Sequence, residues 1–227
     1  MHKNKNFLAI IPARGGSKRL PKKNTLSFFG KPLVSWTIEA SLSSHLISDT
    51  IISSDNQEVL EIGKNYGIQT ITRPTELAND TSPTIDTIIH VLKNISVTPD
   101  YIILLQPTSP LRKTKNIDEA IELLIEKNAD AIVSVCETEH SPLWTNTLES
   151  NLDMKNFIPN DIKNKRSQDL PISYRLNGAI YICDVNKLLR EKTLFLKENI
   201  YAYKMNKKCS IDIDDEIDFK LAELLFD

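Results

Sequence analysis

The stretch from Ala13 to Asn24 carries the clearest chemistry in the chain, because it combines two adjacent glycines with five basic residues in ten positions. Gly15 and Gly16 allow close approach of the backbone to a ligand and positive φ angles. Successive N–H groups there predict a nest for an anion. Three cations and one hydroxyl suit triphosphate oxygens: Arg14, Lys18, Lys23 and Ser17. The stretch is neither a P-loop nor a GxGxxG dinucleotide fingerprint.

The opposite end of the chain is acidic. From Asp212 to Asp227 there are seven acids against Lys220 alone, whereas no acid precedes Glu39 and eight positive charges do. Asp212 and Asp214 are spaced i and i+2, so they project to the same side of an extended segment. That geometry suits two carboxylates on one or two Mg²⁺ ions. Together the two ends predict a polyphosphate site with one basic and one acidic wall.

Short apolar runs typical of buried strands must position these residues. They are expected at 7–11, 50–53, 69–71, 101–105, 131–135, 179–182 and 200–203. Helices are expected between them, at 33–42, 55–66 (capped by Asp55), 84–92, 117–125, 185–190 and 216–226. This alternation predicts a mainly parallel sheet covered on both faces. Ligands bind beyond the carboxyl ends of such strands, so the loops after Pro12, Ser53 and Gln106 are the predicted site.

The pattern weakens between residues 137 and 173, a polar stretch with three prolines. It cannot build a core of its own, so it is either disordered or packs on a partner subunit. The rest of the 227 residues forms one domain of ordinary size.

Composition excludes several classes of protein. A net charge of −2 and 7% aromatic residues argue against a nucleic-acid-binding module or an anionic-membrane binder. The three cysteines are far apart, and neither they nor the four histidines form a zinc motif. The polar start and the short apolar run after it do not predict a signal peptide or a membrane span, so a cytoplasmic location is expected.

Five stretches in register extend over nearly the whole chain: Ile11-Pro-Ala-Arg-Gly-Gly-Ser-Lys18 with Leu20-Pro21 and Lys23-Asn24; Gly30-Lys-Pro-Leu33; Arg73-Pro-Thr-Glu-Leu-Ala78 with Asp80-Thr81; Leu105-Gln-Pro-Thr-Ser-Pro-Leu-Arg112; and Arg175-Leu-Asn-Gly-Ala179 with Asp212-Ile-Asp214. In these stretches the chain resembles the CMP-sialic acid synthetases (acylneuraminate cytidylyltransferases). The resemblance implies a single α/β domain over 1–227 with a three-layer, Rossmann-like nucleotide-diphospho-sugar transferase fold and a mostly parallel sheet. It also implies a homodimer, with a small dimerisation extension at about 137–173 reaching the partner's site.

The family joins CTP to a nine-carbon α-keto sugar acid and releases pyrophosphate, so the resemblance implies this reaction with Mg²⁺ as cofactor. The anomeric C2 hydroxyl would attack the α-phosphorus directly. No Ser-His-Asp or Cys-His arrangement is visible that would supply a covalent nucleophile.

By the same similarity, CTP would be held by Ala13, Arg14, Gly16, Ser17, Lys18, Lys23, Asn24, Arg73, Ala78, Ser82 and Thr84. The cations and Ser17 would bind the phosphates, Asn24 would contact the ribose side, and Arg73 with residues 78–84 would face the cytosine. The sugar acid would be contacted by Gln106, Thr108, Arg175 and Asn177. The metal would be bound by Asp212 and Asp214, and the catalytic residues would be Arg14, Lys18, Lys23 and Asp214.

One departure and several alternatives accompany this resemblance. Arg19 and Lys22 stand where the family commonly has small residues or glycine, which leaves the conformation of the loop open. The substrate is expected to be of N-acetylneuraminate or legionaminate type. Pseudaminate and the eight-carbon keto-deoxy-octonate are the alternatives within the class. A non-catalytic nucleotide-binding protein on the same fold is the alternative from another class.

Overall fold

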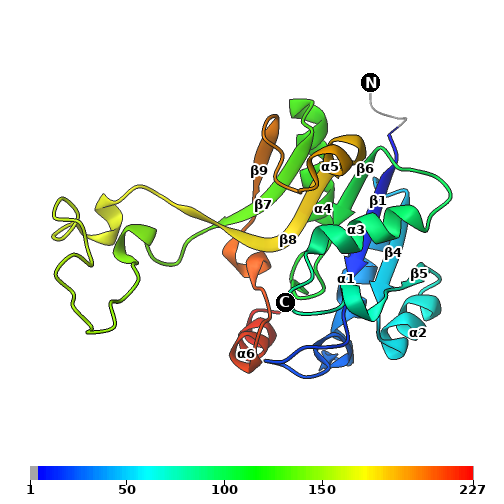
Figure 1. The fold of residues 1–227 in the computed structure, drawn as a ribbon, viewed down its shortest axis with the longest axis horizontal. Coiled ribbons are helices and arrows are strands. Elements are labelled where there is room, and N and C mark those ends of the chain that lie inside the picture. Colours follow the sequence, from blue (N-terminus) through cyan, green and yellow to red (C-terminus); the bar gives the residue numbers. More distant parts are fainter. Residues whose placement is uncertain (1–4, 227) are drawn as a thin grey trace.

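The computed structural model describes residues 5–226, so Lys3 and Asp227, counted above among the terminal charges, lie outside the described residues. One seven-stranded sheet has the order β5-β4-β1-β6-β8-β7-β9 (Figure 1). Its strands are β1 (Phe7–Pro12), β4 (Asp49–Ser54), β5 (Gln69–Thr72), β6 (Tyr101–Leu104), β7 (Ala131–Glu137), β8 (Tyr174–Asp184) and β9 (Ile200–Lys204). A small hairpin, β2 (Ser27–Phe28) with β3 (Lys31–Pro32), lies outside this sheet.

The sheet is mostly parallel, as the sequence predicts. Strands β5, β4, β1 and β6 pair in parallel, and β7 pairs in parallel with β9. Only β8 runs the other way, antiparallel to both β6 and β7. The carboxyl ends of β1, β4, β5 and β6 therefore meet at one edge of the sheet, where a ligand is expected.

Helices cover both faces of the sheet and make three layers. Helices α1 (Leu33–Leu42), α2 (Gln57–Asn65) and α4 (Thr114–Lys127) pack on one face. Helices α3 (Thr84–Lys93) and α5 (Val185–Glu191) pack on the other. Along β1, Ala9 and Ile11 belong to the first core while Leu8 and Ile10 belong to the second. The apolar run of β1 is continuous because the strand is buried on both faces.

The helix α6 (Glu216–Leu225) packs against the β2–β3 hairpin and α1 through a third, aromatic core around Phe28. Phe28 is fully buried and meets the rings of Trp36, Phe219 and Phe226 edge to face. This packing ties the acidic end of the chain to the segment that follows the basic loop.

The predicted elements are all present, with three differences. The cap of α2 is Asn56, whose side chain accepts from the Val59 N–H at 3.2 Å, and not Asp55. The sequence reading missed the β2–β3 hairpin, which is only two residues long on each side. It also placed the start of β8 too late, because the first residues of that strand, which pair with the end of β7, are partly exposed and lack a continuous apolar run.

Residues 138–173, between β7 and β8, form an arm that projects far from the body (Figure 1). Its only regular elements are two short 3₁₀ turns, Pro142–Trp144 and Ser167–Asp169. Several large apolar side chains of the arm are exposed: Leu148, Leu152, Met154 and Ile172. Among residues 5–226, no helix has both the length and the apolarity to cross a lipid bilayer.

Candidate active site

A cavity of about 320 Å³ opens at the carboxyl ends of β1, β5 and β6, whereas the loop after β4, also predicted from the sequence, does not line it. It brings together eleven of the residues predicted from the sequence: Arg14, Ser17, Lys23, Asn24, Arg73, Ser82, Thr84, Gln106, Thr108, Asp212 and Asp214. Segments from four parts of the chain, 12–24, 73–87, 106–108 and 212–214, thus meet at the carboxyl edge of the sheet.

The loop 13–24, called the basic loop below, begins at Ala13, which is buried and pairs with β4 through its N–H and the Ser53 carbonyl. Gly15 donates its N–H to Asp55 at 2.8 Å. A Cβ on Gly15 would lie 2.9 Å from Asn56 Cβ, so close packing requires glycine at this position. Neither Gly15 nor Gly16 has a positive φ, contrary to the sequence expectation; Lys22 takes the left-handed conformation instead, at φ 56°.

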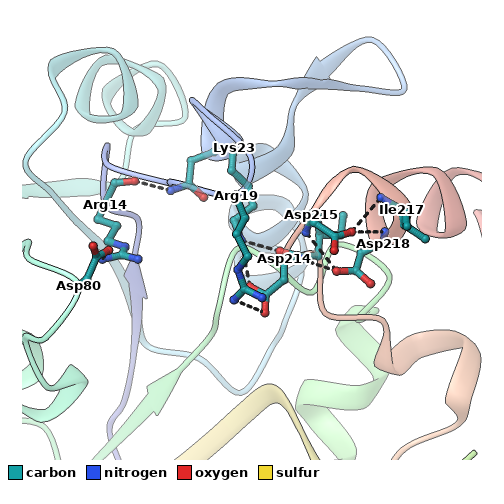
Figure 2. Close-up of polar contacts among 10 residues, drawn as sticks. Arg14, Arg19, Lys23, Asp80, Asp214, Asp215, Ile217 and Asp218 are labelled. Carbon is teal, nitrogen blue, oxygen red and sulfur yellow. Dashed lines mark hydrogen bonds and ion pairs between the residues drawn. The ribbon is translucent and has the colours of Figure 1, made fainter.

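Exposed ion pairs tie the basic loop to two acids (Figure 2). Arg14 Nη1 lies 2.8 Å from Asp80, and Lys18 Nζ lies 2.5 Å from the same carboxylate. These contacts, Lys18 foremost, hold the pKa of Asp80 below its ordinary value. Across the cavity, Arg19 Nη2 lies 2.8 Å from Asp214. Lys18 itself does not line the cavity, but Asp80, its partner, does.

Lys23 differs from the other cations of the loop because its side chain is only 11% exposed. Its Nζ donates to the Ile213 carbonyl at 2.6 Å and lies 3.4 Å from Asp214 Oδ1. Lys23 therefore joins the basic loop directly to the acidic segment, residues 212–218.

The acidic segment has the geometry that the i, i+2 spacing predicts. Ile213 is fully buried in the aromatic core, and its N–H donates to the Thr108 carbonyl at 2.8 Å. The Asp212 and Asp214 side chains both line the cavity on the other side. Asp218 fixes the segment from α6, since its carboxylate accepts from the N–H groups of Asp214 and Asp215 at 2.9 and 3.1 Å (Figure 2).

The donor set fits a divalent cation shared with a ligand. Among residues 5–226, no group of three or more His, Cys, Asp or Glu side chains is arranged to hold a metal alone. Mg²⁺ commonly takes one or two carboxylates and completes its shell with phosphate oxygens and water. Burial raises the pKa of Asp212, and the neighbouring Asp214 adds to the rise. A cation between the two carboxylates would relieve that unfavourable charge.

The opposite wall of the cavity carries buried polar atoms that lack partners within the described residues. Arg73 is 6% exposed and donates to the Ser53 carbonyl at 2.9 Å, while its Nε has no partner. Burial lowers the pKa of this guanidinium. Asn24 donates to the Arg14 carbonyl at 2.8 Å, and its Oδ1 is unpartnered. Unpaired buried polar atoms are costly, so both atoms suit hydrogen bonds to a ligand.

Five predicted site residues lie elsewhere than on the cavity wall, besides Lys18: Ala13, Gly16, Ala78, Arg175 and Asn177. Arg175 binds Glu139 of the arm through two nitrogens, at 3.2 and 3.0 Å, which raises the pKa of Arg175. Asn177, also off the wall, is 1% exposed and bonds to Ser134 and Ser210 in the interior. Asn177 thus anchors β8 to the segment that leads into Asp212.

Three contributors to the site escaped sequence reasoning. Asp80, which belongs to one of the five stretches quoted above, holds two cations of the basic loop. Gly178 has φ 72°, and a Cβ there would lie 2.7 Å from Gln106 Oε1 and 3.4 Å from Asp212 Oδ2. Arg112 bonds to the Gln106 carbonyl from the interior. All three residues lie within the quoted motifs, but a motif alone does not predict which side chains or main-chain groups they contact.

Comparison with known proteins agrees with this geometry. Residues 8–225 match the family model described as "Cytidylyltransferase". The chain is 36% identical to a CMP-N,N'-diacetyllegionaminic acid synthase of Legionella pneumophila, over 97% of this chain and 96% of that protein. It is 38% identical to an N-acylneuraminate cytidylyltransferase of Streptococcus agalactiae, over 97% of this chain and 54% of that protein. Among solved structures, a CMP:2-keto-3-deoxy-manno-octonic acid synthetase complexed with CTP superposes with a TM-score of 0.73, at 17% identity over 97% of this chain and 98% of that one.

Proposed function

The chain belongs to the cytidylyltransferase family, and from that premise we propose that it joins CTP to a nine-carbon α-keto sugar acid, giving the CMP-sugar and pyrophosphate. The observation that carries this proposal is the cavity itself. Cations of the basic loop and the two carboxylates of the acidic segment face one space at the carboxyl edge of the sheet. A nucleoside triphosphate with a divalent metal needs both kinds of group at once.

The basic loop would hold the triphosphate. Arg14, Lys18 and Lys23 would neutralise charge on the α-phosphoryl group and on the departing pyrophosphate, as fixed cations do in phosphoryl transfer. Arg14 and Lys18 would exchange Asp80 for phosphate oxygens. The unpartnered Oδ1 of Asn24 would accept from a ribose hydroxyl, and Arg73 with the 78–84 segment would face the base.

Asp212 and Asp214 would hold Mg²⁺. When bound there, Mg²⁺ would supply Lewis-acid chemistry, which would stabilise negative charge on the phosphates and favour loss of the proton from the attacking hydroxyl. Buried Lys23, between the basic loop and Asp214, would keep the phosphate and metal subsites at a fixed separation. The sugar acid would lie on the Gln106 and Thr108 side, with its anomeric hydroxyl directed at the α-phosphorus.

The names of the relatives support the proposed class of substrate. One relative aligned over nearly its full length is named for diacetyllegionaminic acid, and another for N-acylneuraminate. We therefore expect a legionaminate- or sialate-type acid. The synthetase for the eight-carbon acid shares the fold at 17% identity and carries no argument about substrate.

The experiment is release of pyrophosphate from CTP and Mg²⁺ with a panel of acceptors: N-acetylneuraminate, legionaminate, pseudaminate, keto-deoxy-octonate and glucose 1-phosphate. Turnover with one nine-carbon acid identifies the substrate. Turnover only with pseudaminate or with keto-deoxy-octonate would replace the proposed acceptor by that acid. Silence with every acid, from protein that still binds CTP, would contradict the proposed reaction.

The arm would be the dimerisation extension. The arm projects away from the body (Figure 1), its apolar side chains named above are exposed, and a second subunit would cover them. Leu152→Asp with Met154→Asp should convert a dimer to a monomer in light scattering. Val97→Asp, at another exposed apolar residue outside the arm, is the control. A monomeric parent protein at micromolar concentration would contradict this assignment.

A further inference from the structure

The side chain of Arg112 is a buried cation in the turn after β6, residues 105–113. It is 2% exposed and makes no ion pair with an acidic side chain among the described residues. Burial alone lowers its pKa to about 9. An unpaired charge in the interior is unfavourable unless hydrogen bonds satisfy it, and a Met or Leu of similar volume would avoid that penalty.

All of the acceptors that Arg112 uses lie behind one wall of the cavity. Its Nη1 donates to the carbonyls of Gln106 and Ala179, at 3.1 and 2.9 Å. Its Nη2 donates to the Thr37 hydroxyl at 2.8 Å. The guanidinium therefore joins three elements, the end of β6, the middle of β8 and helix α1, and only its Nε lacks a partner within residues 5–226.

The Gln106 carbonyl is held more firmly than an ordinary loop carbonyl. Besides Arg112, it accepts from the Thr37 hydroxyl at 3.5 Å and from the Ser109 N–H at 3.3 Å. Gln106 also lines the cavity, and its side-chain Oε1 lies against Gly178. With the carbonyl fixed, the main chain from which the Gln106 side chain departs is fixed as well.

The second carbonyl belongs to Ala179, the residue after Gly178. The Gln106 side chain packs against Gly178. The Gln106 Oε1 lies 2.7 Å from where a Cβ of Gly178 would stand, and Asp212 Oδ2 lies 3.4 Å from the same point. Arg112 thus holds the main chain on both sides of the contact between the Gln106 amide and Gly178. The contact lies beside a carboxylate of the acidic segment.

We propose that Arg112 is a positioning residue for acceptor binding, which sets the Gln106 amide against Gly178 from inside the protein without touching substrate. The proposal rests on the proposed function, in which Gln106 contacts the sugar acid. It predicts that a change at Arg112 affects the acceptor and not the nucleotide, because the basic loop is anchored separately, by Asp55, Asp80 and Asp214.

The test is a double-mutant cycle between Arg112→Lys and Gln106→Ala. Arg112→Lys keeps the charge but cannot reach all three acceptors with a planar fork. We expect the KM for the sugar acid to rise about tenfold, while the KM for CTP stays within about twofold. In the Gln106→Ala background the same change should add less than about twofold, since two residues acting through one contact are not additive. Equal rises in both KM values, or full additivity, would overturn the proposal.

Two further variants keep the test decisive if Arg112→Lys does not fold. Thr37→Val removes the hydroxyl that bonds both Arg112 and the Gln106 carbonyl, and should raise the KM for the acid in the same direction by a smaller factor. Ser41→Ala is the matched control, since it removes another buried hydroxyl of α1, bonded to Thr50. A Thr37→Val protein with the same KM values as Ser41→Ala would contradict the role of Arg112.

A readout without turnover separates this proposal from the proposed function. The side-chain amide of Gln106 can be assigned in a proton–nitrogen NMR spectrum by its loss in Gln106→Ala. In the parent protein it should be shifted from the free-amide position, and in Arg112→Lys or Thr37→Val it should move towards that position. An unmoved signal overturns the positioning role even if no acid in the panel proves to be a substrate.

Discussion

The two sides of the cavity are held in place by different forces. The turn after β6 is fixed from within, by a guanidinium that is 2% exposed and bonds to main-chain carbonyls of the turn itself and of β8. The basic loop is fixed largely from outside. Arg14, Lys18 and Arg19 form ion pairs with Asp80 and Asp214 through side chains that are 38 to 85% exposed.

This difference separates a preorganised surface from an exchangeable one. Buried hydrogen bonds to a charged group cannot be replaced by water without a large penalty, so the turn keeps one shape. Exposed ion pairs contribute about 0–1 kcal/mol each and are screened by salt. The basic loop can therefore trade its acids for phosphate oxygens at small net cost. An acceptor site that selects one sugar gains from the first property, and a site that must bind and release phosphates gains from the second.

The largest effect is expected at Lys23. Unlike the exposed, ion-paired cations of the basic loop, Lys23 is held from inside the protein. It is nearly buried and bonds to the acidic segment, so water cannot replace it. Lys23→Ala should lower kcat/KM by about 10²–10³-fold, the loss typical of removing a fixed group that stabilises transition-state charge. Steady-state pyrophosphate release measures it.

The control for Lys23 is its neighbour. Lys22→Gly also removes one positive charge, and glycine accepts the φ of 56° at that position without strain. It should leave kcat/KM within about threefold of the parent. A similar loss in both variants would mean that the loop acts through its total charge and not through Lys23.

The next variant, Gly178→Ala, tests the preorganised wall of the cavity, which is the turn after β6 with the part of β8 that packs against it. The added methyl meets Gln106 Oε1 at 2.7 Å, so the amide must leave its place, and the φ of 72° adds backbone strain. We expect the KM for the sugar acid to rise about tenfold with little change for CTP. Gly30→Ala is matched to it, having φ 82° and no atom within 4 Å of the new Cβ. If the two variants give the same kinetics, strain and not displacement of Gln106 explains the effect.

The sequence predicted the basic loop and the acidic segment, which form the exchangeable wall of the cavity, better than it predicted the preorganised wall. Glycines, cations and acids at the ends of apolar runs name a phosphate and metal site directly, because residue type carries that chemistry. The period-2 spacing of Asp212 and Asp214 even gave their common side. By contrast, nothing in the type of Arg112 says that it points inward, and the same spacing rule does not tell which face of β8 Asn177 takes. Those facts depend on which strands become neighbours, and the antiparallel insertion of β8 between β6 and β7 is a long-range outcome.

The smallest effect should come from Asp80, whose removal sharpens the contrast between the walls. Asp80→Ala frees Arg14 and Lys18 from their ion pairs. Because exposed ion pairs contribute little to stability, the unfolding temperature should stay nearly unchanged. Because the two cations no longer have to leave Asp80 to bind phosphate, the KM for CTP should fall, by no more than about threefold. Asp100→Ala, which removes an exposed acid paired with Lys5 elsewhere, is the control and should leave that KM unchanged. Because the pKa of Asp80 is held below its ordinary value, its pairs persist at neutral pH and are lost only as the pH falls through the folded-state pKa. Salt screens exposed ion pairs, so the advantage of Asp80→Ala should shrink as salt is added. A large loss of CTP affinity instead would mean that Asp80 binds the nucleotide complex itself.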